Sequence, residues 1–260
     1  MTAAWNPALY LRHAGERGRP FLDLIARVDV TPASIVDLGC GPGQLTPVLH
    51  SRWPTAWIVG VDSSPEMIAA ARAQAADLSA EYVEADAAKW EPDGQVDLIV
   101  SNALFQWVPD QLDVIRRLAG HVAPGGAFAI QVPNNMTAPS HALLHEISSR
   151  PPYAEYMAGV RGPRGTDPES YLELFADLGW DVDVWQSTYL HVLHGDDPVF
   201  SWISGTGARP VLQSLPDNLR DRFETEYKAA LRDAYPAKPW GTVLPFTRAF
   251  AVAHRTLPVT

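Results

Sequence analysis

Three glycines at alternate positions, directly after a β-branched run, constrain this chain more than any other feature. The run Ser34–Leu38 predicts a buried parallel strand, and Gly39, Gly41 and Gly43 follow it. Only glycine lets the backbone turn that tightly and lets a ligand approach the main chain closely. Residues 44–53 are expected to form a helix whose N-terminus faces the loop. Together, strand, glycine loop and helix predict a nucleotide-binding corner.

The glycine spacing discriminates between nucleotide cofactors. A dinucleotide fingerprint Gly-x-Gly-x-x-Gly that starts at Gly39 needs glycine at position 44, where this chain has Gln44. An NAD-dependent oxidoreductase is therefore disfavoured.

Strand-like and helix-like runs alternate along the chain. Strands are expected at 34–38, 57–61, 80–84, 96–100, 127–132, 181–192 and 243–254, with a turn at 124–126. Helices are expected at 66–77, 112–121, 141–149, 167–179, 198–204 and 216–235. This alternation predicts an α/β fold with a doubly wound, mostly parallel seven-stranded sheet.

Two segments are longer than a minimal fold of this kind needs. Residues 134–165 and 195–237 are excursions of the type that usually carries function. Residues 1–29 precede the first strand and predict one or two short helices, with Pro20 in a first helical turn. We expect these three segments to form a cap on a single domain of residues 1–260, whose cofactor-binding core is 33–133.

A polar residue stands at or just past the end of each of the first four strands, where open parallel sheets bind ligands. Asp62 lies about 20 residues past the loop, as expected for an acid that binds ribose hydroxyls. Asp86 is placed to pair with an adenine amino group, and Met67 suits the other face of an adenine. The candidate cofactor-binding residues are Asp37, Gly39, Gly41, Gln44, Asp62, Ser63, Met67, Asp86, Ala87, Asn102, Ala103 and Trp107. Any one acid could instead cap a helix, but four in strand order favour a site.

Composition limits the partners. The net charge of −10 disfavours nucleic acid, and an anionic substrate needs a local cluster of cations. The lone cysteine, Cys40, fits a reducing cytoplasm, and no secretory signal or membrane span is expected. We expect a cytoplasmic monomer without a metal, because His141 and His145 lack a third ligand at readable spacing.

The segment Asp37-Leu38-Gly39-Cys40-Gly41-Pro42-Gly43 is similar to the first motif of the class I S-adenosylmethionine-dependent methyltransferases, and the resemblance covers about 33–132. Further segments, most of them outside that core, narrow the resemblance to one family. They resemble the trans-aconitate 2-methyltransferase family and are Trp5–Leu11, Glu16–Arg17, Arg19–Pro20, 62–69, 105–110, 182–185 and 206–210.

The resemblance implies a Rossmann-like class I methyltransferase fold and a small polycarboxylate substrate. It implies in-line methyl transfer from S-adenosylmethionine to a carboxylate of trans-aconitate, giving a monomethyl ester and S-adenosylhomocysteine. A carboxylate is already ionised at neutral pH, so no catalytic residue is expected beyond those that position the reactants. The candidate substrate-binding residues, cationic or hydroxyl donors in segments expected near the pocket, are Tyr10, His13, Arg19, Arg161, Arg164, Tyr189 and Arg209.

Two other functions stay open at this point. The protein could methylate another anionic substrate, such as a malonyl group on a carrier protein. It could also be a regulator that binds S-adenosylmethionine without turnover.

Overall fold

The structure, a computed structural model, describes residues 14–74 and 79–257. These residues divide into two compact units. The larger contains residues 14–133, Thr166–Gln186 and 248–257, and the smaller contains Asn134–Gly165 and Ser187–Thr247. The expected cap segments 134–165 and 195–237 belong to the smaller unit, whereas residues 14–29 belong to the larger. Their role as a cap stays a prediction.

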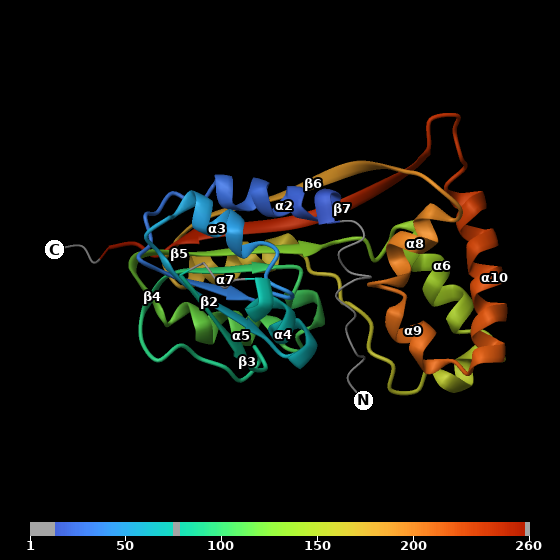
Figure 1. The fold of residues 1–260 in the computed structure, drawn as a ribbon, viewed down its shortest axis with the longest axis horizontal. Helices are drawn as coiled ribbons and strands as arrows, with labels where there is room; N and C mark the ends of the chain where they lie inside the picture. The colour runs from blue at the N-terminus through green and yellow to red at the C-terminus, as the bar shows by residue number, and fades with distance from the viewer. Residues whose placement is uncertain (1–13, 75–78, 258–260) are drawn as a thin grey trace. The chain divides into compact units, whose positions relative to one another are not determined.

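A seven-stranded sheet runs through the described residues (Figure 1). Its strands are β1 (Ser34–Leu38), β2 (Trp57–Asp62), β3 (Ala80–Glu84), β4 (Val96–Asn102), β5 (Val122–Pro133), β6 (Asp181–Leu193) and β7 (Thr242–His254). The order is β3-β2-β1-β4-β5-β7-β6. Strands β1 to β5 pair in parallel, and β7 pairs antiparallel to β5. The predicted fold class is therefore confirmed.

The strand register sets which side chains share a face. Asp37 of β1 pairs with Val100 of β4, and Asn102, two residues further along β4, pairs with Gln131 of β5. Paired residues and residues two apart in a strand point to the same side of a sheet. Asp37, Asn102 and Gln131 therefore lie on one face, in a row across the carboxyl ends of three parallel strands.

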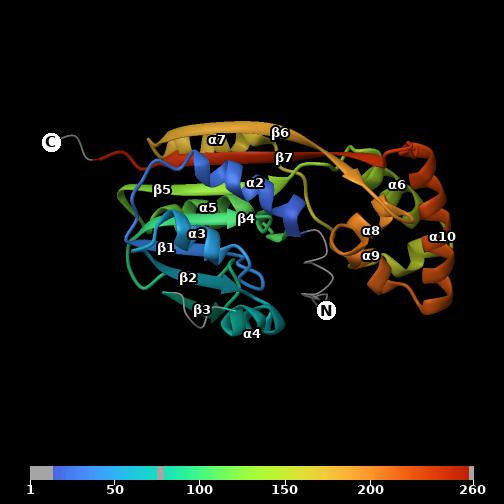
Figure 2. The same cartoon turned by 45° about the horizontal axis from the view of Figure 1, so that its top comes forward.

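Helices cover both faces of the larger unit's sheet (Figure 1, Figure 2). One face carries α2 (Ala14–Ala26), α3 (Thr46–Arg52) and α4 (Pro65–Gln74), and the other carries α5 (Gln111–Ala119) and α7 (Pro168–Asp177). Under α5 and α7 lies an apolar core in which Phe128 contacts Phe105 and Phe175, with ring centroids 6.3 Å and 5.8 Å apart. The polar row of Asp37, Asn102 and Gln131 lies on the opposite face.

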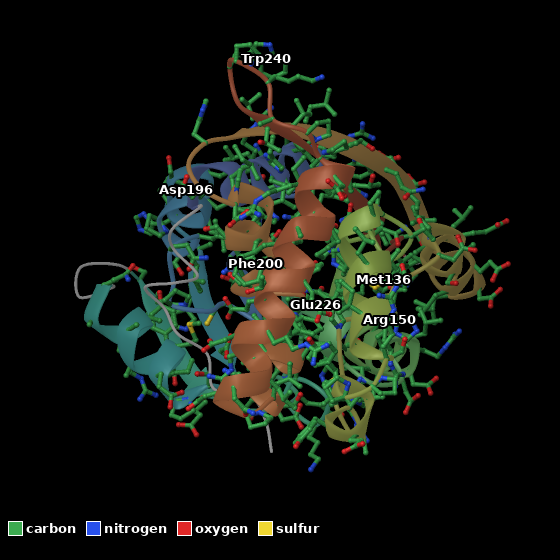
Figure 3. The ribbon with its side chains drawn as sticks, turned by 90° about the vertical axis from the view of Figure 1, so that its right-hand side faces the viewer. Met136, Arg150, Asp196, Phe200, Glu226 and Trp240 are labelled. Atoms are coloured by element: carbon green, nitrogen blue, oxygen red, sulfur yellow. The ribbon has the colours of Figure 1, made fainter. Side chains whose placement is uncertain are left out.

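The smaller unit is mainly helical and has its own core. Its helices are α6 (Pro139–Ser148), η2 (Tyr153–Tyr156), α8 (Pro198–Ser204), α9 (Arg209–Ser214) and α10 (Asp217–Ala234). Figure 3 looks onto α10, which carries Glu226, with Phe200 of α8 beside it. The hydroxyl of Tyr227 donates a hydrogen bond of 2.6 Å to the carbonyl oxygen of Ser140, which ties α10 to α6.

The structure corrects two local predictions and adds one short α-helix. Pro20 lies in the interior of α2 rather than in a first turn, because the helix already begins at Ala14. Residues 124–126 belong to an irregular start of β5, where Gly125 N donates to Arg255 O at 2.9 Å. Arg209 begins the helix α9, for which no prediction was made, and Pro210 suits a first helical position.

Candidate active site

The glycine loop has the backbone conformation that its sequence predicts. Gly39, Gly41 and Gly43 all have positive φ, at +81°, +56° and +78°. The loop is fixed to the neighbouring strand, because the backbone N–H of Gly39 donates to the carbonyl oxygen of Val61 at 2.7 Å.

The start and the middle of this loop differ in the space they leave for a side chain or a ligand. A Cβ on Gly39 would lie 2.8 Å from Leu104 Cβ, so packing alone requires glycine there. At Gly41 the nearest atom to such a Cβ is Gln44 Oε1, at 3.8 Å, which is ordinary contact distance. The middle of the loop is therefore open enough for a ligand to approach the backbone.

Asp62 joins the end of β2 to the glycine loop. Its Oδ2 accepts a hydrogen bond from the backbone N–H of Gly41 at 3.0 Å, and its Oδ1 accepts one from Ser64 N at 2.9 Å. Burial raises the pKa of this carboxyl, and the backbone donors oppose that rise. Ser63 is exposed beside it, and Ser64 Oγ accepts from Met67 N at 3.3 Å at the start of α4. Met67 itself is buried.

Asp37 is the most unusual acid of the site. Its side chain is 1% exposed, and its Oδ2 has no hydrogen-bond partner among the described residues. Burial, followed by repulsion from Asp62, raises the pKa of Asp37 to about 7. Gln44 Oε1 is likewise buried without a partner in the described part of the chain. Acceptors left unsatisfied in this way fit a ligand that brings cations or hydroxyl donors.

Further cofactor-binding candidates lie in the loop after β3 and at the end of β4. Asp86 is exposed, and its Oδ1 accepts from Ala88 N at 2.9 Å, which holds a local turn, while Ala87 is buried. Asn102 is buried at the end of β4, with its Oδ1 unpartnered among the described residues. Ala103, next along the chain, has a positive φ of 59°.

Trp107 ends the short helix η1 (Phe105–Trp107) and is partly buried. Gln106, beside it, is buried; its Nε2 donates to Ala103 O at 2.7 Å, and its Oε1 has no partner in the described part of the chain. Gln106 is not among the cofactor-binding residues predicted from the sequence.

The predicted substrate residues differ in burial. Tyr10 and His13 lie outside the described residues. In the larger unit, Arg19 is exposed on α2. Arg161 and Arg164 are exposed in the smaller unit, between η2 and residue 165.

Two other substrate candidates of the smaller unit, Tyr189 and Arg209, are buried. Tyr189 stacks on His191 with ring centroids 6.2 Å apart, and burial lowers the pKa of Arg209 to about 10. An arginine with that pKa is still charged at neutral pH. Each of these roles stays a prediction.

Gln131 and Arg248 are two buried polar side chains that were not predicted from the sequence. Gln131 interrupts the apolar part of β5, and Arg248 interrupts that of β7, yet both are buried. Arg248 Nη1 donates to Gln131 Oε1 at 3.4 Å. A polar residue inside a run that is otherwise predicted as a buried strand was the signal that could have identified them.

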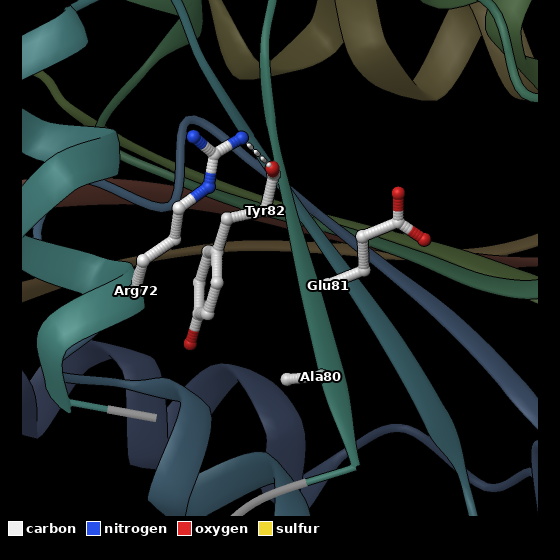
Figure 4. Close-up of a pocket in the computed structure, with 4 residues that line it drawn as sticks. All are labelled: Arg72, Ala80, Glu81 and Tyr82. Carbon is white, nitrogen blue, oxygen red and sulfur yellow. Dashed lines mark hydrogen bonds between the residues drawn. The ribbon is translucent and has the colours of Figure 1, made fainter. Parts of the chain in front are cut away.

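A shallow hollow on the edge strand β3 is separate from these groups (Figure 4). It is lined by Arg72, Ala80, Glu81 and Tyr82, and Arg72 donates to the carbonyl oxygen of Tyr82 at 2.7 Å. It contains no residue of the glycine loop and none of the candidate site residues.

The residues that the structure describes offer neither a metal-binding cluster nor a membrane-spanning helix. No group of three or more His, Cys, Asp or Glu side chains in these ranges could hold a metal ion. His141 packs next to Ser140, with 3.2 Å between Ser140 Oγ and His141 Nδ1. Burial lowers the pKa of the His141 imidazole to about 4. Within residues 14–74 and 79–257, no helix is both long and apolar enough to span a bilayer.

Comparisons with known proteins agree with this geometry. A sequence model described as a methyltransferase domain matches residues 35–126. A Mesorhizobium loti S-adenosylmethionine-dependent methyltransferase structure shares the fold, with a TM-score of 0.53, 20% identity, and 93% and 99% of the two chains covered. A Streptomyces coelicolor protein named trans-aconitate 2-methyltransferase is 48% identical over 96% of this chain and 86% of its own. The Streptomyces avermitilis protein of that name is 48% identical over 97% of both chains. This chain therefore belongs to the trans-aconitate 2-methyltransferase family.

Proposed function

We propose that this protein transfers a methyl group from S-adenosylmethionine to one carboxylate of trans-aconitate, giving a monomethyl ester and S-adenosylhomocysteine. The observation that carries the proposal is that this chain is 48% identical, over nearly its full length, to two relatives named trans-aconitate 2-methyltransferase. The similarity includes the smaller unit, which lies outside the general methyltransferase domain at 35–126. The relatives therefore also share the part of the chain that we expect to bind the substrate.

The residues at the carboxyl ends of β1, β2 and β4 fit the cofactor. S-adenosylmethionine carries a carboxylate, an ammonium, two ribose hydroxyls and a methyl group on a positively charged sulfur. Asp37 and Asn102 offer buried oxygens without partners in the described residues, suited to ammonium and hydroxyl donors. Asp62 would hold the ribose, and Met67 would face the adenine, as would Asp86, Ala87, Ala103 and Trp107 from the following loops. Gly39, Gly41, Gln44 and Ser63 complete this set.

The chemistry asks little of the protein beyond positioning. A carboxylate with an ordinary pKa near ~4 is ionised at neutral pH, so no side chain has to remove a proton. The protein must hold one carboxylate oxygen against the methyl group, bind the other carboxylates and exclude water. Arginines suit that second task because a guanidinium pairs with a carboxylate through two parallel hydrogen bonds. Arg209, buried and charged, is the strongest candidate of the predicted set.

We further propose that the substrate is a free small polycarboxylate and that the enzyme acts as a cytoplasmic monomer. A net charge of −10 and a single cysteine, Cys40, support a setting without nucleic acid and without disulfides. Cys40 is buried, and burial raises the pKa of its thiol, so it is unsuited to act as a nucleophile.

One assay tests the function. Purified protein is incubated with methyl-labelled S-adenosylmethionine and with trans-aconitate, cis-aconitate, citrate or a malonyl-loaded carrier protein in separate reactions. We expect label in a monomethyl ester of trans-aconitate, identified by mass spectrometry, with at least tenfold lower kcat/KM for the others. Preferred labelling of the carrier protein would assign a different substrate. Tight binding of S-adenosylmethionine without any turnover would indicate a regulator.

A further inference from the structure

A buried polar patch lies on the face of the sheet that α2 covers. It consists of Asn102 at the end of β4, Gln131 near the end of β5, and Arg248 in β7. Asn102 pairs with Gln131 in the parallel register, and Arg248 pairs with Pro133, two residues beyond Gln131. The side chains of Asn102, Gln131 and Arg248 therefore point to the same side.

The patch contains a buried amide donor that the described part of the chain leaves without a partner. Gln131 is 0% exposed, and its Nε2 has no hydrogen-bond partner among the described residues. Its Oε1 is engaged by Arg248 Nη1 at 3.4 Å, so the amide is oriented with its N–H groups away from that guanidinium nitrogen. A buried amide donor without a partner is costly, and such groups in native proteins call for an explanation.

The unpartnered amide donor of Gln131, beside a cation, indicates the chemistry of a matching ligand. Arg248 is 5% exposed, so a guanidinium has been taken out of water next to a spare amide donor. Two sets of N–H donors, one of them cationic, lie side by side in a dry environment. A carboxylate matches this arrangement, since it only accepts hydrogen bonds and carries the opposite charge.

The patch also continues the row of candidate cofactor residues. Asp37, Asn102 and Gln131 follow one another across β1, β4 and β5, and Arg248 comes next on β7. A group bound at Gln131 and Arg248 would therefore be a neighbour of whatever Asn102 binds.

We propose that Gln131 and Arg248 form a subsite for one carboxylate of the substrate, with Gln131 Nε2 and the Arg248 guanidinium as donors. This inference rests on the proposed function. A tricarboxylate has two carboxylates that do not react, and this subsite would bind one of them and hold the substrate next to the cofactor-binding row.

Two variants separate this role from a purely structural one. Gln131→Met keeps the size of the side chain and removes the unpartnered amide, while Arg248→Lys keeps the charge and removes the planar fork. Arg116→Lys, on the exposed surface of α5, is the matched control. The measurements are the thermal midpoint, the affinity for S-adenosylhomocysteine by calorimetry, and the affinity and kcat/KM for trans-aconitate.

We expect Gln131→Met to keep or raise the thermal midpoint, because it removes a buried unsatisfied donor. The same variant should lose at least fivefold in trans-aconitate affinity, while its S-adenosylhomocysteine affinity stays within twofold of the parent. Arg248→Lys should lose at least tenfold in trans-aconitate affinity. A merely structural role would move stability and substrate affinity in the same direction.

Dicarboxylates identify the group that is bound. Itaconate and trans-glutaconate each lack a different carboxylate of trans-aconitate. The acid that lacks the carboxylate held at this subsite should bind the parent protein weakly. Its affinity should fall no more than twofold in the Arg248→Lys variant.

Trans-aconitate affinity and kcat/KM within twofold of the parent in Gln131→Met overturn the inference, even where Arg248→Lys fails to fold. A parent protein that neither binds nor methylates any of these acids overturns the proposed function instead, and the inference with it.

Discussion

Asp62 Oδ2 accepts a hydrogen bond of 3.0 Å from the backbone N–H of Gly41, so the acid at the end of β2 supports the most open position of the glycine loop. The carboxylate proposed to bind the ribose is thereby already oriented by the backbone of the loop. Preorganisation of this kind lowers the entropy that a ligand loses on binding.

Replacing Asp62 with alanine should weaken binding of S-adenosylhomocysteine by at least about 2 kcal/mol, or roughly 30-fold, because charge-assisted hydrogen bonds to two hydroxyls are lost. Titration calorimetry measures this, with Asp113→Ala on the surface of α5 as the control. Equal affinities in the two variants would remove Asp62 from the cofactor site.

Stability should depend on pH through Asp37. Its pKa is raised by burial from 3.8 to about 7, so the protonated form stabilises the fold at low pH, and that stability is lost as the pH rises through about 7. Asp37→Asn stays neutral throughout. Its free energy of unfolding relative to the parent should therefore increase between pH 5 and about pH 7, by at most about 3 kcal/mol, and should change little above that. Urea denaturation at several pH values checks this; a difference independent of pH, as expected for Asp113→Asn, would contradict it.

Arg209→Lys should retain cofactor affinity and lose much of kcat/KM for trans-aconitate. A paired guanidinium and carboxylate in a partly dry pocket is worth on the order of 2–4 kcal/mol, and lysine keeps the charge without the planar fork. We expect both KM and kcat to change, since the substrate would be bound less tightly and less well oriented. Steady-state kinetics beside Arg222→Lys, an exposed residue paired with Glu226 at 2.9 Å, provide the comparison. Values within twofold of the parent would shift attention to Arg19 and Arg161.

Gly60→Ala should destabilise the larger unit. A Cβ at Gly60 would lie 2.6 Å from the Tyr82 ring, which is held by a 2.9 Å hydrogen bond from its hydroxyl to Thr46 Oγ1. Overpacking of this kind costs about 1–3 kcal/mol. Gly94→Ala is the control, because a Cβ there meets nothing within 4 Å. Chemical denaturation that ranks the two variants as equally stable would show that the ring can move aside.

The strand and helix pattern of the larger unit could be predicted because local signals agreed with the fold. β3 begins and ends at the expected residues, and β1 ends where the glycines begin. The turn expected at 124–126 was wrong because Pro124 and the two glycines after it look like a hairpin, whereas their backbone pairs with the chain beyond β7. That pairing involves residues about 130 positions away, which no local pattern records.

The candidate site residues likewise divide into those that local sequence patterns predict and those that depend on distant strand pairing. Asp37, Asp62 and Asn102 could be found because each stands at or near the end of a recognisable parallel strand. Gln131 and Arg248 could not, because their proximity depends on β7 lying antiparallel beside β5. In sequence they are single polar residues in apolar strands, separated by 117 positions.

The strand order has a consequence for how the chain is made. β7 lies between β5 and β6, so β6 has its sheet neighbour only after β7 has been synthesised. β1 to β5 can pair with one another as they leave the ribosome, because each has a neighbour that is already present or soon follows. The edge of the sheet beyond β5 must wait for residues 242–254. A nascent chain can therefore assemble its glycine loop early, and it carries an incomplete sheet until β7 has been synthesised.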